Sequence, residues 1–290
     1  MGNIDRRILY LIALLVMALP LFMNVPLPVA KNPNSLNFFN RIQNLDQSNG
    51  KNIILLCANF SPDTKGESIP QAASVVRHML TVGKKFAIFT FNSGTPAGQE
   101  LANTEVQDVA NELNAKNPGG KQLTYGVDWV NLGYKPATLP ILQSLPRDIP
   151  GWFGHDSRGT LLADIPVMKG IKDYHDIGLV IDVSPSATYL WLMPAITDKY
   201  RKPLLLAPTS VMVPDIYPFV KSGQVAGLLR GILGAAEYEA LLKERGIAPT
   251  TYKGTRQMTS VAALDAYIML LIVIGNVAYF RSRTRKEAAQ

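Results

Sequence analysis

The chain has 290 residues, of which 47% are hydrophobic, and a formal net charge of +7 at pH 7. This length supports one sizeable domain with a buried core plus short flanking segments. The excess positive charge is concentrated at the two ends, and the middle has no basic run interleaved with aromatic residues, which argues against a nucleic-acid-binding protein. The single cysteine, Cys57, excludes an internal disulfide and lies in an apolar run, where a buried thiol is expected.

The N-terminal segment, residues 1–30, has the pattern of a membrane anchor. Arg6 and Arg7 precede an apolar run that Pro20 interrupts. The run is short for a membrane span, and a basic segment followed by an apolar one also describes a signal peptide. Because Pro28 occupies a place where cleavage requires a small residue, we expect an uncleaved signal anchor that forms a transmembrane helix, with cleavage as the alternative.

Residues 31–50 carry an apolar stripe at helical spacing and predict an amphipathic linker helix between this anchor and a domain at 51–250. Within the domain, apolar runs alternate with helical patterns. Strands are expected at 53–60, 86–91, 127–132, 178–183, 203–207 and 224–229, and helices at 72–80, 101–113, 139–145, 187–200, 214–220 and 232–244. This alternation predicts an α/β fold with a doubly wound, mostly parallel sheet of five to six strands, Rossmann-like or flavodoxin-like.

One connection, residues 146–176, is much longer than the others, and long connections usually carry function or their own structure. It contains Trp152 and Phe153 between two glycines. These aromatic residues predict a surface insertion that touches a partner, a lid or the membrane interface. The alternative is that both rings pack onto the edge of the sheet.

Ligands of doubly wound sheets bind outside the carboxyl ends of the strands. The polar residues expected at this edge are mostly uncharged: Asn59, Ser61, Asp63, Asn92, Ser93, Thr95, Asn131, Asp182, Ser184, Ser186 and Thr209. They predict a site for a polar ligand, such as a phosphate at a helix N-terminus. Helix caps and turns require the same residue types, so a purely structural role is the alternative.

Residues 259–281 form a second apolar stretch, followed by a basic tail at 282–290. Twenty helical residues cover about 30 Å, the thickness of a hydrocarbon core. Because Lys and Arg are retained on the cytoplasmic side, we expect a transmembrane helix with both termini of the chain in the cytoplasm. The main domain then lies outside the cytoplasm, anchored to the plasma or inner membrane.

Two polar residues, Asp265 and Asn276, lie about three turns apart in this stretch and share one helix face with Ala262 and Ile272. Polar groups inside a membrane usually face protein or water. This face is therefore expected to pack against the N-terminal helix, another copy of the chain or a different membrane protein. The alternative is that Asp265 is shallow and solvated at the outer interface.

Common catalytic and cofactor motifs are missing from the sequence. It has no dinucleotide fingerprint, P-loop or nucleophile elbow, and its three histidines lack metal-ligand spacing. We therefore expect no cofactor, no bound metal and no catalytic residue.

Several segments carry a resemblance: RRILYLIALL, YGVDWVNLGYKP, SRGTLLADIPVMKG, GLLRGILGAAEYE and IVIGNVAYF. Together they resemble a family of uncharacterised prokaryotic membrane proteins that are anchored at both ends around a Rossmann-like domain. The resemblance implies this architecture and brings no known activity.

The leading functional hypothesis is a non-enzymatic subunit or scaffold of a membrane protein assembly. Its partners would be the lipid bilayer and other membrane proteins or further copies of the chain. The first alternative is a domain that binds or senses a polar small molecule. The second is a membrane-bound hydrolase or transferase acting on an envelope substrate, with Asp63, Ser93, Asp182 and Ser184 as candidate residues.

Overall fold

The chain, described by a computed structural model, divides into two compact units. The smaller unit comprises Met1–Pro28 with Thr255–Gln290, and the larger comprises Val29–Gly254. The structure describes residues 5–22, 30, 32–92, 96–247, 249 and 251–287. The larger unit holds the β-sheet, and the smaller holds the N-terminal helix and most of the C-terminal helix.

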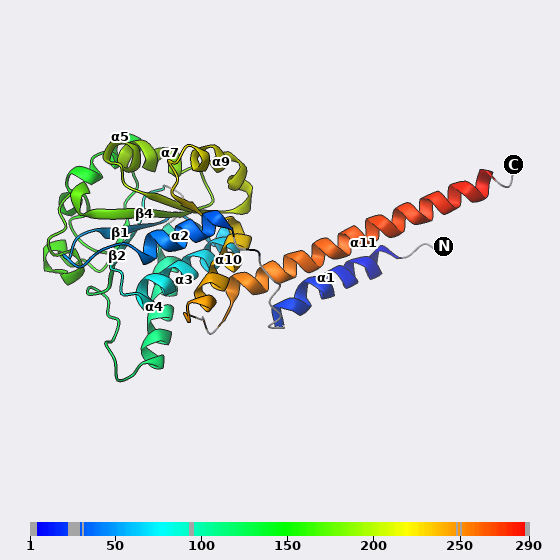
Figure 1. The fold of residues 1–290 in the computed structure, drawn as a ribbon, viewed down its shortest axis with the longest axis horizontal. Coiled ribbons are helices and arrows are strands. Elements are labelled where there is room, and N and C mark those ends of the chain that lie inside the picture. The colour runs from blue at the N-terminus through cyan, green and yellow to red at the C-terminus, as the bar shows by residue number, and fades with distance from the viewer. Residues whose placement is uncertain are drawn as a thin grey trace. The chain divides into compact units, whose positions relative to one another are not determined.

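Among the described residues, six parallel strands form one sheet in the order β3-β2-β1-β4-β5-β6 (Figure 1). The strands are β1 (Ile53–Ala58), β2 (Phe86–Thr90), β3 (Trp129–Tyr134), β4 (Ile177–Ser184), β5 (Leu204–Pro208) and β6 (Gly227–Leu228). The chain builds outward from β1 to β3, crosses back beside β1 and builds outward again from β4, as in Rossmann-like folds. The predicted parallel α/β fold is thereby confirmed.

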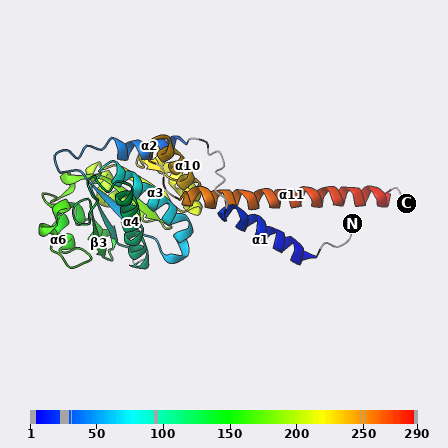
Figure 2. The ribbon, with the colours of Figure 1, turned by 90° about the horizontal axis from the view of Figure 1, so that it is seen from below.

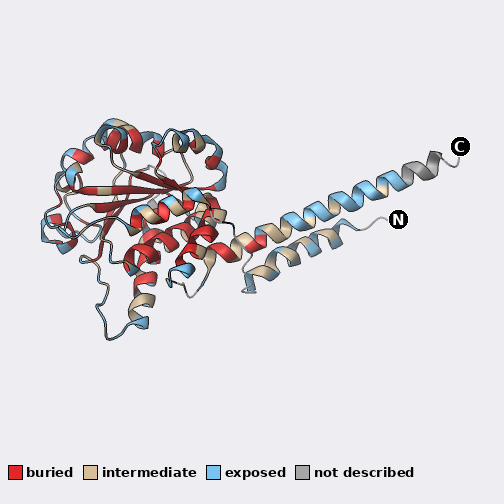
Figure 3. Ribbon diagram, in the orientation of Figure 1, coloured by how far each residue is buried: buried red, intermediate tan, exposed pale blue. Residues whose placement is uncertain are grey.

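The sheet is buried on both faces, which explains why its strands are almost continuously apolar (Figure 3). Successive residues of β1 alternate between two hydrophobic cores. Ile54 and Leu56 belong to one core, and Leu55 and Cys57 belong to the other. Such a sheet requires a helical layer on each face.

Long helices form one layer, and short helices form the other. The first layer contains α2 (Pro33–Gln43), α3 (Lys65–Thr81), α4 (Pro96–Lys116) and α10 (Gly231–Glu244) (Figure 2). The second contains α5 (Leu139–Leu142), α6 (Ile149–Phe153), α7 (Tyr189–Leu192) and α9 (Val213–Lys221). Helices therefore cover both faces of the sheet.

Helix α2 belongs to this first layer, although the sequence pattern predicts a linker helix within 31–50. Its side chains Phe38, Phe39 and Ile42 are buried in the core. The helix approaches β6 closely at Gly227, where an added Cβ would lie 2.6 Å from the Cα of Phe38. Glycine at this position allows α2 to pack against the edge strand.

The helix predicted over 187–200 is divided into three pieces. Helix α7 is followed by a π-helical segment, Met193–Thr197, and by α8 (Asp198–Tyr200). Pro194 has no N–H for an α-helical hydrogen bond, which explains the wider turn at this point. The helix ends at Arg201, whose backbone adopts a left-handed conformation with φ 52° and ψ 37°.

The long connection 146–176 contains α6 and short 3-10 turns, and its apolar side chains line the second core. Trp152 is only 7% exposed and packs edge-on against Phe89, with ring centroids 6.2 Å apart. Phe153 contacts the same ring edge-on at 5.3 Å. Both rings therefore pack onto the sheet, as the alternative interpretation of the sequence expected. This packing gives no support to the prediction that Trp152 and Phe153 touch a partner.

In the smaller unit, helix α11 (Lys253–Glu287) has 35 residues. Among the described residues it is the one helix long and apolar enough to cross a membrane, over Lys253–Arg281. Helix α1 (Arg6–Phe22) has 17 residues, about 25 Å, which is below the length expected of a span. The apolar C-terminal helix is thus present, whereas no N-terminal helix long enough to span a membrane is found among the described residues.

Helices α1 and α11 run antiparallel and are joined by two hydrogen bonds. The hydroxyl of Tyr267 donates to the carbonyl of Leu9 at 3.0 Å. The hydroxyl of Ser260 donates to the carbonyl of Met17. One side of α11 therefore contacts α1 through Ser260 and Tyr267.

A buried histidine joins three helices of the first layer. His78 of α3 contacts the Tyr238 hydroxyl of α10 at 2.7 Å through Nδ1 and the amide oxygen of Gln43 in α2 at 2.9 Å through Nε2. The ring also stacks on Phe39. Because an amide oxygen only accepts, Nε2 donates and Nδ1 accepts from Tyr238. Burial lowers the pKa of His78 from 6.5 to about 3, so the folded protein holds a neutral imidazole.

We expect His78 to make the folded state acid-sensitive. Its pKa is lower in the folded state than in the unfolded chain, so protons bind the unfolded chain preferentially and stability falls as pH drops below about 6.5. Protonation of His78 in the unfolded chain lowers the unfolding free energy of the wild type by about 2 kcal/mol between pH 7 and pH 5, and His78→Gln should lack this contribution. Denaturant unfolding of the full-length protein in micelles measures this, with His175→Gln, an exposed histidine, as the control. Equal pH dependence in His78→Gln and the wild type would contradict the assignment.

Candidate functional site

The candidate site lies at the carboxyl ends of β1 and β4, where the strand order reverses. Asn59 follows β1, and Asp182 lies near the end of β4. The side-chain amide of Asn59 donates to one carboxylate oxygen of Asp182 at 2.8 Å. Asn59 and Asp182 are both buried. In Rossmann-like sheets this reversal point opens the crevice in which ligands bind.

Asp182 is a buried carboxyl group without a cationic partner among the described residues. The second oxygen of Asp182 accepts a hydrogen bond of 2.5 Å from the Thr188 hydroxyl. The residue is only 2% exposed. Burial raises the pKa of Asp182 to about 7, against the opposing effect of the hydrogen bonds from Thr188 and Asn59. Near neutral pH this group therefore exchanges a proton easily.

Asn59 connects three strands at this point. Its side-chain oxygen accepts hydrogen bonds from the backbone N–H of Phe91 at 3.1 Å and of Asn92 at 3.4 Å, just after β2. Asn92 donates in turn to the hydroxyl of Ser186 at 3.0 Å. The hydroxyl groups of Ser186 and Ser184 lie 3.1 Å apart. The polar edge is thus one continuous hydrogen-bonded network from β2 to β4.

The structure brings together only part of the predicted edge. Five predicted residues belong to the network just described: Asn59, Asn92, Asp182, Ser184 and Ser186. Thr188 also belongs to it, and sequence reasoning did not single it out. The available signal was its position in the turn after β4, where a hydroxyl can reach back to the strand.

Two predicted residues serve local turns instead. Ser61 donates to the carboxylate of Asp63 within the 3-10 turn that follows β1. This hydrogen bond is the main reason why the pKa of the exposed Asp63 is lowered. Both residues therefore have the capping role that was the structural alternative.

Asn131 likewise has structural partners, since its side-chain oxygen accepts from the Gln99 amide and from the backbone N–H of Gly133. Ser93 and Thr95 lie outside the described residues.

Thr209, after β5, lies in a different environment. Its buried hydroxyl has no hydrogen-bond partner within the described part of the chain, and the same is true of Ser68 Oγ and Gln71 Oε1. The amide nitrogen of Gln71 donates to the carbonyl of Pro208 at 3.1 Å, which places α3 against the end of β5. Buried polar atoms are normally hydrogen-bonded, so these three atoms can still accept or donate a bond.

The groups of this network can form hydrogen bonds and exchange a proton. Ser184 bonds to Ser186, and no described residue acts as a base toward it. Cys57, beside Asp182 in the sheet, is fully buried, and burial raises the pKa of its thiol well above the usual value. No group of three or more His, Cys, Asp or Glu in the described ranges could hold a metal ion. The network can donate to, accept from and exchange a proton with a polar ligand.

No protein-family model matches the chain, and no curated protein or solved structure matches it significantly. The function is therefore inferred from the geometry of this site and from the helices of the smaller unit.

We expect Asp182 to reduce stability as the pH rises. Its pKa is higher in the folded protein than in the unfolded chain, so the contribution of Asp182 to stability is greatest below about pH 4 and falls until the pH passes about 7. Asp182→Asn should remove this decrease, which amounts to about 4 kcal/mol. Unfolding of the micellar full-length protein between pH 4 and pH 8 measures it. Asp63→Asn, an exposed carboxylate after the neighbouring strand, is the control and should keep the wild-type slope across this window. An unchanged slope in Asp182→Asn would show that Asp182 is ionised throughout.

Proposed function

We propose that this protein is a non-enzymatic subunit or scaffold of a membrane protein assembly in the plasma or inner membrane. In this proposal α11 spans the bilayer, residues 1–30 as a whole act as a signal anchor, both termini are cytoplasmic and the α/β unit lies outside the cytoplasm. The length and apolar character of α11 and the basic residues near its C-terminal end support this orientation.

The observation that carries the proposal is the polar face of α11. At about 100° per residue, Asp265 and Asn276 point roughly 140–180° away from Ser260 and Tyr267, which bond to α1. Both polar residues are exposed, as is Ile272 between them. Because α1 contacts the opposite side of α11, this geometry supports an occupant other than α1 on the polar face.

We assign this face to a helix of a different membrane protein. In a symmetric dimer of this chain, two Asp265 carboxylates would meet on the same face and repel each other. A partner helix with a hydrogen-bond donor, such as Lys, Arg or Asn, complements both Asp265 and Asn276. Ala262, which is half-buried, offers a small side chain at the same side of the helix.

The test is affinity purification of the full-length protein in mild detergent, followed by mass spectrometry of the co-purifying proteins. We expect a stoichiometric membrane partner, and Asp265→Leu should reduce its recovery at least tenfold, because the buried donor of the partner loses its acceptor. Tyr267→Phe, which changes the α1 side of the same helix, is the matched control. A solitary wild-type protein, or equal losses in both variants, would contradict the proposal.

A second function, binding or sensing of a polar small molecule, is favoured by the network at β1 and β4. Its hydrogen-bonding groups lie at the reversal point of the strand order, and Asp182 changes protonation near pH 7. A ligand that bonds to this network would therefore bind with an affinity that depends on pH.

A thermal-shift screen of the full-length protein with nucleotides, sugars and phosphates at pH 6 and pH 8 tests this second function. We expect a ligand whose stabilising shift differs between the two pH values and is lost in Ser186→Ala, since this half-buried hydroxyl stands at the outer end of the network. Thr104→Ala, an exposed hydroxyl on α4, should retain the shift. A shift that is equal in both variants would place the ligand elsewhere.

A further inference from the structure

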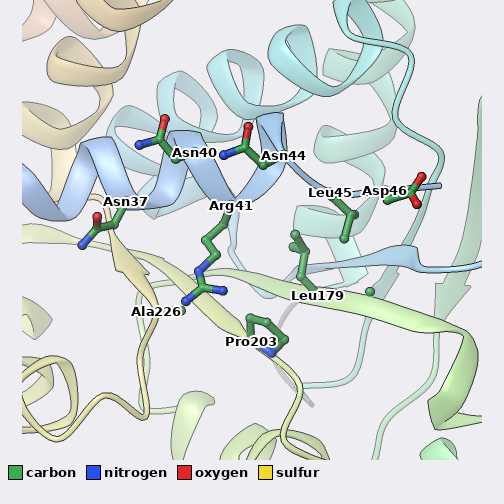
Figure 4. A pocket seen from close by; sticks show the side chains of 10 residues that line it. Asn37, Asn40, Arg41, Asn44, Leu45, Asp46, Leu179, Pro203 and Ala226 are labelled. Carbon is green, nitrogen blue, oxygen red and sulfur yellow. The ribbon is translucent and has the colours of Figure 1, made fainter. Parts of the chain in front are cut away.

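A groove lies at the opposite edge of the sheet, beside the amino ends of β4, β5 and β6. It consists of two adjoining cavities of about 430 and 400 Å³ that share Arg41, Pro203 and Ala226. Arg41 extends from α2 toward Pro203 and Ala226 (Figure 4). Cavities of this volume fit a small metabolite.

Three cationic side chains line the groove. Arg41 comes from α2, and Arg201 and Lys202 precede β5. None of the three forms an ion pair within the described ranges. The acidic residue of the second cavity is Asp198. Both of its carboxylate oxygens accept a hydrogen bond of 3.3 Å from the side-chain amide nitrogen of Gln224. Arg41 and Arg201 are therefore free to bind an anion, whereas Lys202 also interacts electrostatically with Asp176 and Asp173.

The first cavity adds uncharged hydrogen-bonding groups. Asn37 and Asn40 of α2, and Asn44 directly after the helix, are among the residues that line this cavity (Figure 4). Their spacing of three and four residues places them on one side of the helix. Asp46, at the far end of this cavity, accepts from the backbone N–H of Ser48. Side-chain amides both donate and accept, which suits the hydroxyl groups of a sugar or polyol.

Arg201 has an unusual backbone for its residue type. Its φ of 52° lies in the left-handed region that glycine adopts with the least strain. The chain has arginine at this helix end, and the side chain lines the second cavity. A strained position that places a charged group in a cavity is a sign of a functional role for that group.

We propose that this groove binds a small phosphorylated polyhydroxyl compound. The phosphate lies between Arg41, Arg201 and Lys202, whose guanidinium and ammonium groups donate to its oxygens. The hydroxyl groups lie along the asparagines of α2. This site is independent of the network at β1 and β4 and of the polar face of α11. A free sugar phosphate and a phospholipid headgroup share this chemistry.

Calorimetric titration of the full-length protein in neutral detergent tests the proposal with glucose 6-phosphate, glucose and inorganic phosphate as probes. We expect saturable binding of glucose 6-phosphate, weaker binding of phosphate and at least tenfold weaker binding of glucose. Arg41→Ala and Arg201→Gly should each weaken binding of glucose 6-phosphate at least tenfold. Arg147→Ala, an exposed arginine outside the groove, is the matched control and should bind like the wild type.

Arg201→Gly separates loss of the ligand from loss of the fold. Because glycine relieves the left-handed backbone, this variant should keep or raise the melting temperature while it loses binding. A short-chain phosphatidylglycerol, titrated below its micellar concentration against the matching phosphatidylcholine, distinguishes the lipid source. Preferential binding of the anionic lipid that requires Arg41 and Arg201 supports a headgroup site. If glucose binds as well as its phosphate, or if neither phosphate compound depends on these arginines, the proposal is wrong.

Discussion

The pairing of β1 with β4 determines where the candidate site forms. The register aligns Cys57 with Asp182 and Ala58 with Val183. Asn59, the next residue after β1, therefore lies beside the end of β4. Its backbone N–H donates to the carbonyl of Val183 at 3.0 Å. A shift of one residue would turn Asp182 to the other face of the sheet, away from Thr188. The same pairing creates the reversal of strand order at which the crevice of a Rossmann-like fold lies.

Burial of the sheet on both faces has an electrostatic consequence. It shifts the pKa values of His78, in one layer, and Asp182, at the carboxyl edge, because burial disfavours the charged form of each side chain. Between about pH 4 and pH 6.5 their contributions to stability change in opposite directions. As the pH rises, the contribution of His78 increases, because the unfolded chain loses its proton, and the contribution of Asp182 decreases, because the unfolded carboxyl group ionises more readily than the folded one. The wild-type pH dependence is therefore a difference between two larger contributions.

The two edges of one sheet carry different chemistry. The carboxyl edge near β1 and β4 presents amides, hydroxyls and a carboxyl group that is half protonated near neutral pH. The amino edge beside β4 to β6 presents Arg41, Arg201 and Lys202. A strongly charged ligand suits the second edge, because cations there offset its charge, whereas the buried carboxyl group would repel an anion at the first. Helix α11 shows a similar division, with one side bonded to α1 and a polar side exposed.

Sequence patterns alone predicted the class of the fold, the apolar C-terminal helix and the approximate place of each strand. These features depend on local periodicity and composition, which a single chain displays directly. It also identified Asn59, Asp182, Ser184 and Ser186 as edge residues, because strand ends and turns are local signals. It did not distinguish them from Ser61 and Asp63, which have the same residue types in the same kind of turn.

Only the tertiary structure decided which of these residues meet. Asn59 and Asp182 are separated by 123 positions, and Arg41 shares a cavity with Arg201, a residue from a distant part of the chain. Such contacts depend on strand order and register, which a single sequence does not display. The structure also decided that α2 belongs to the helical layer and that α1 occupies one side of α11. The physical reason is that burial is a property of the whole packed molecule, and burial makes Asp182, a polar residue near the end of β4, a carboxyl group that titrates near neutral pH.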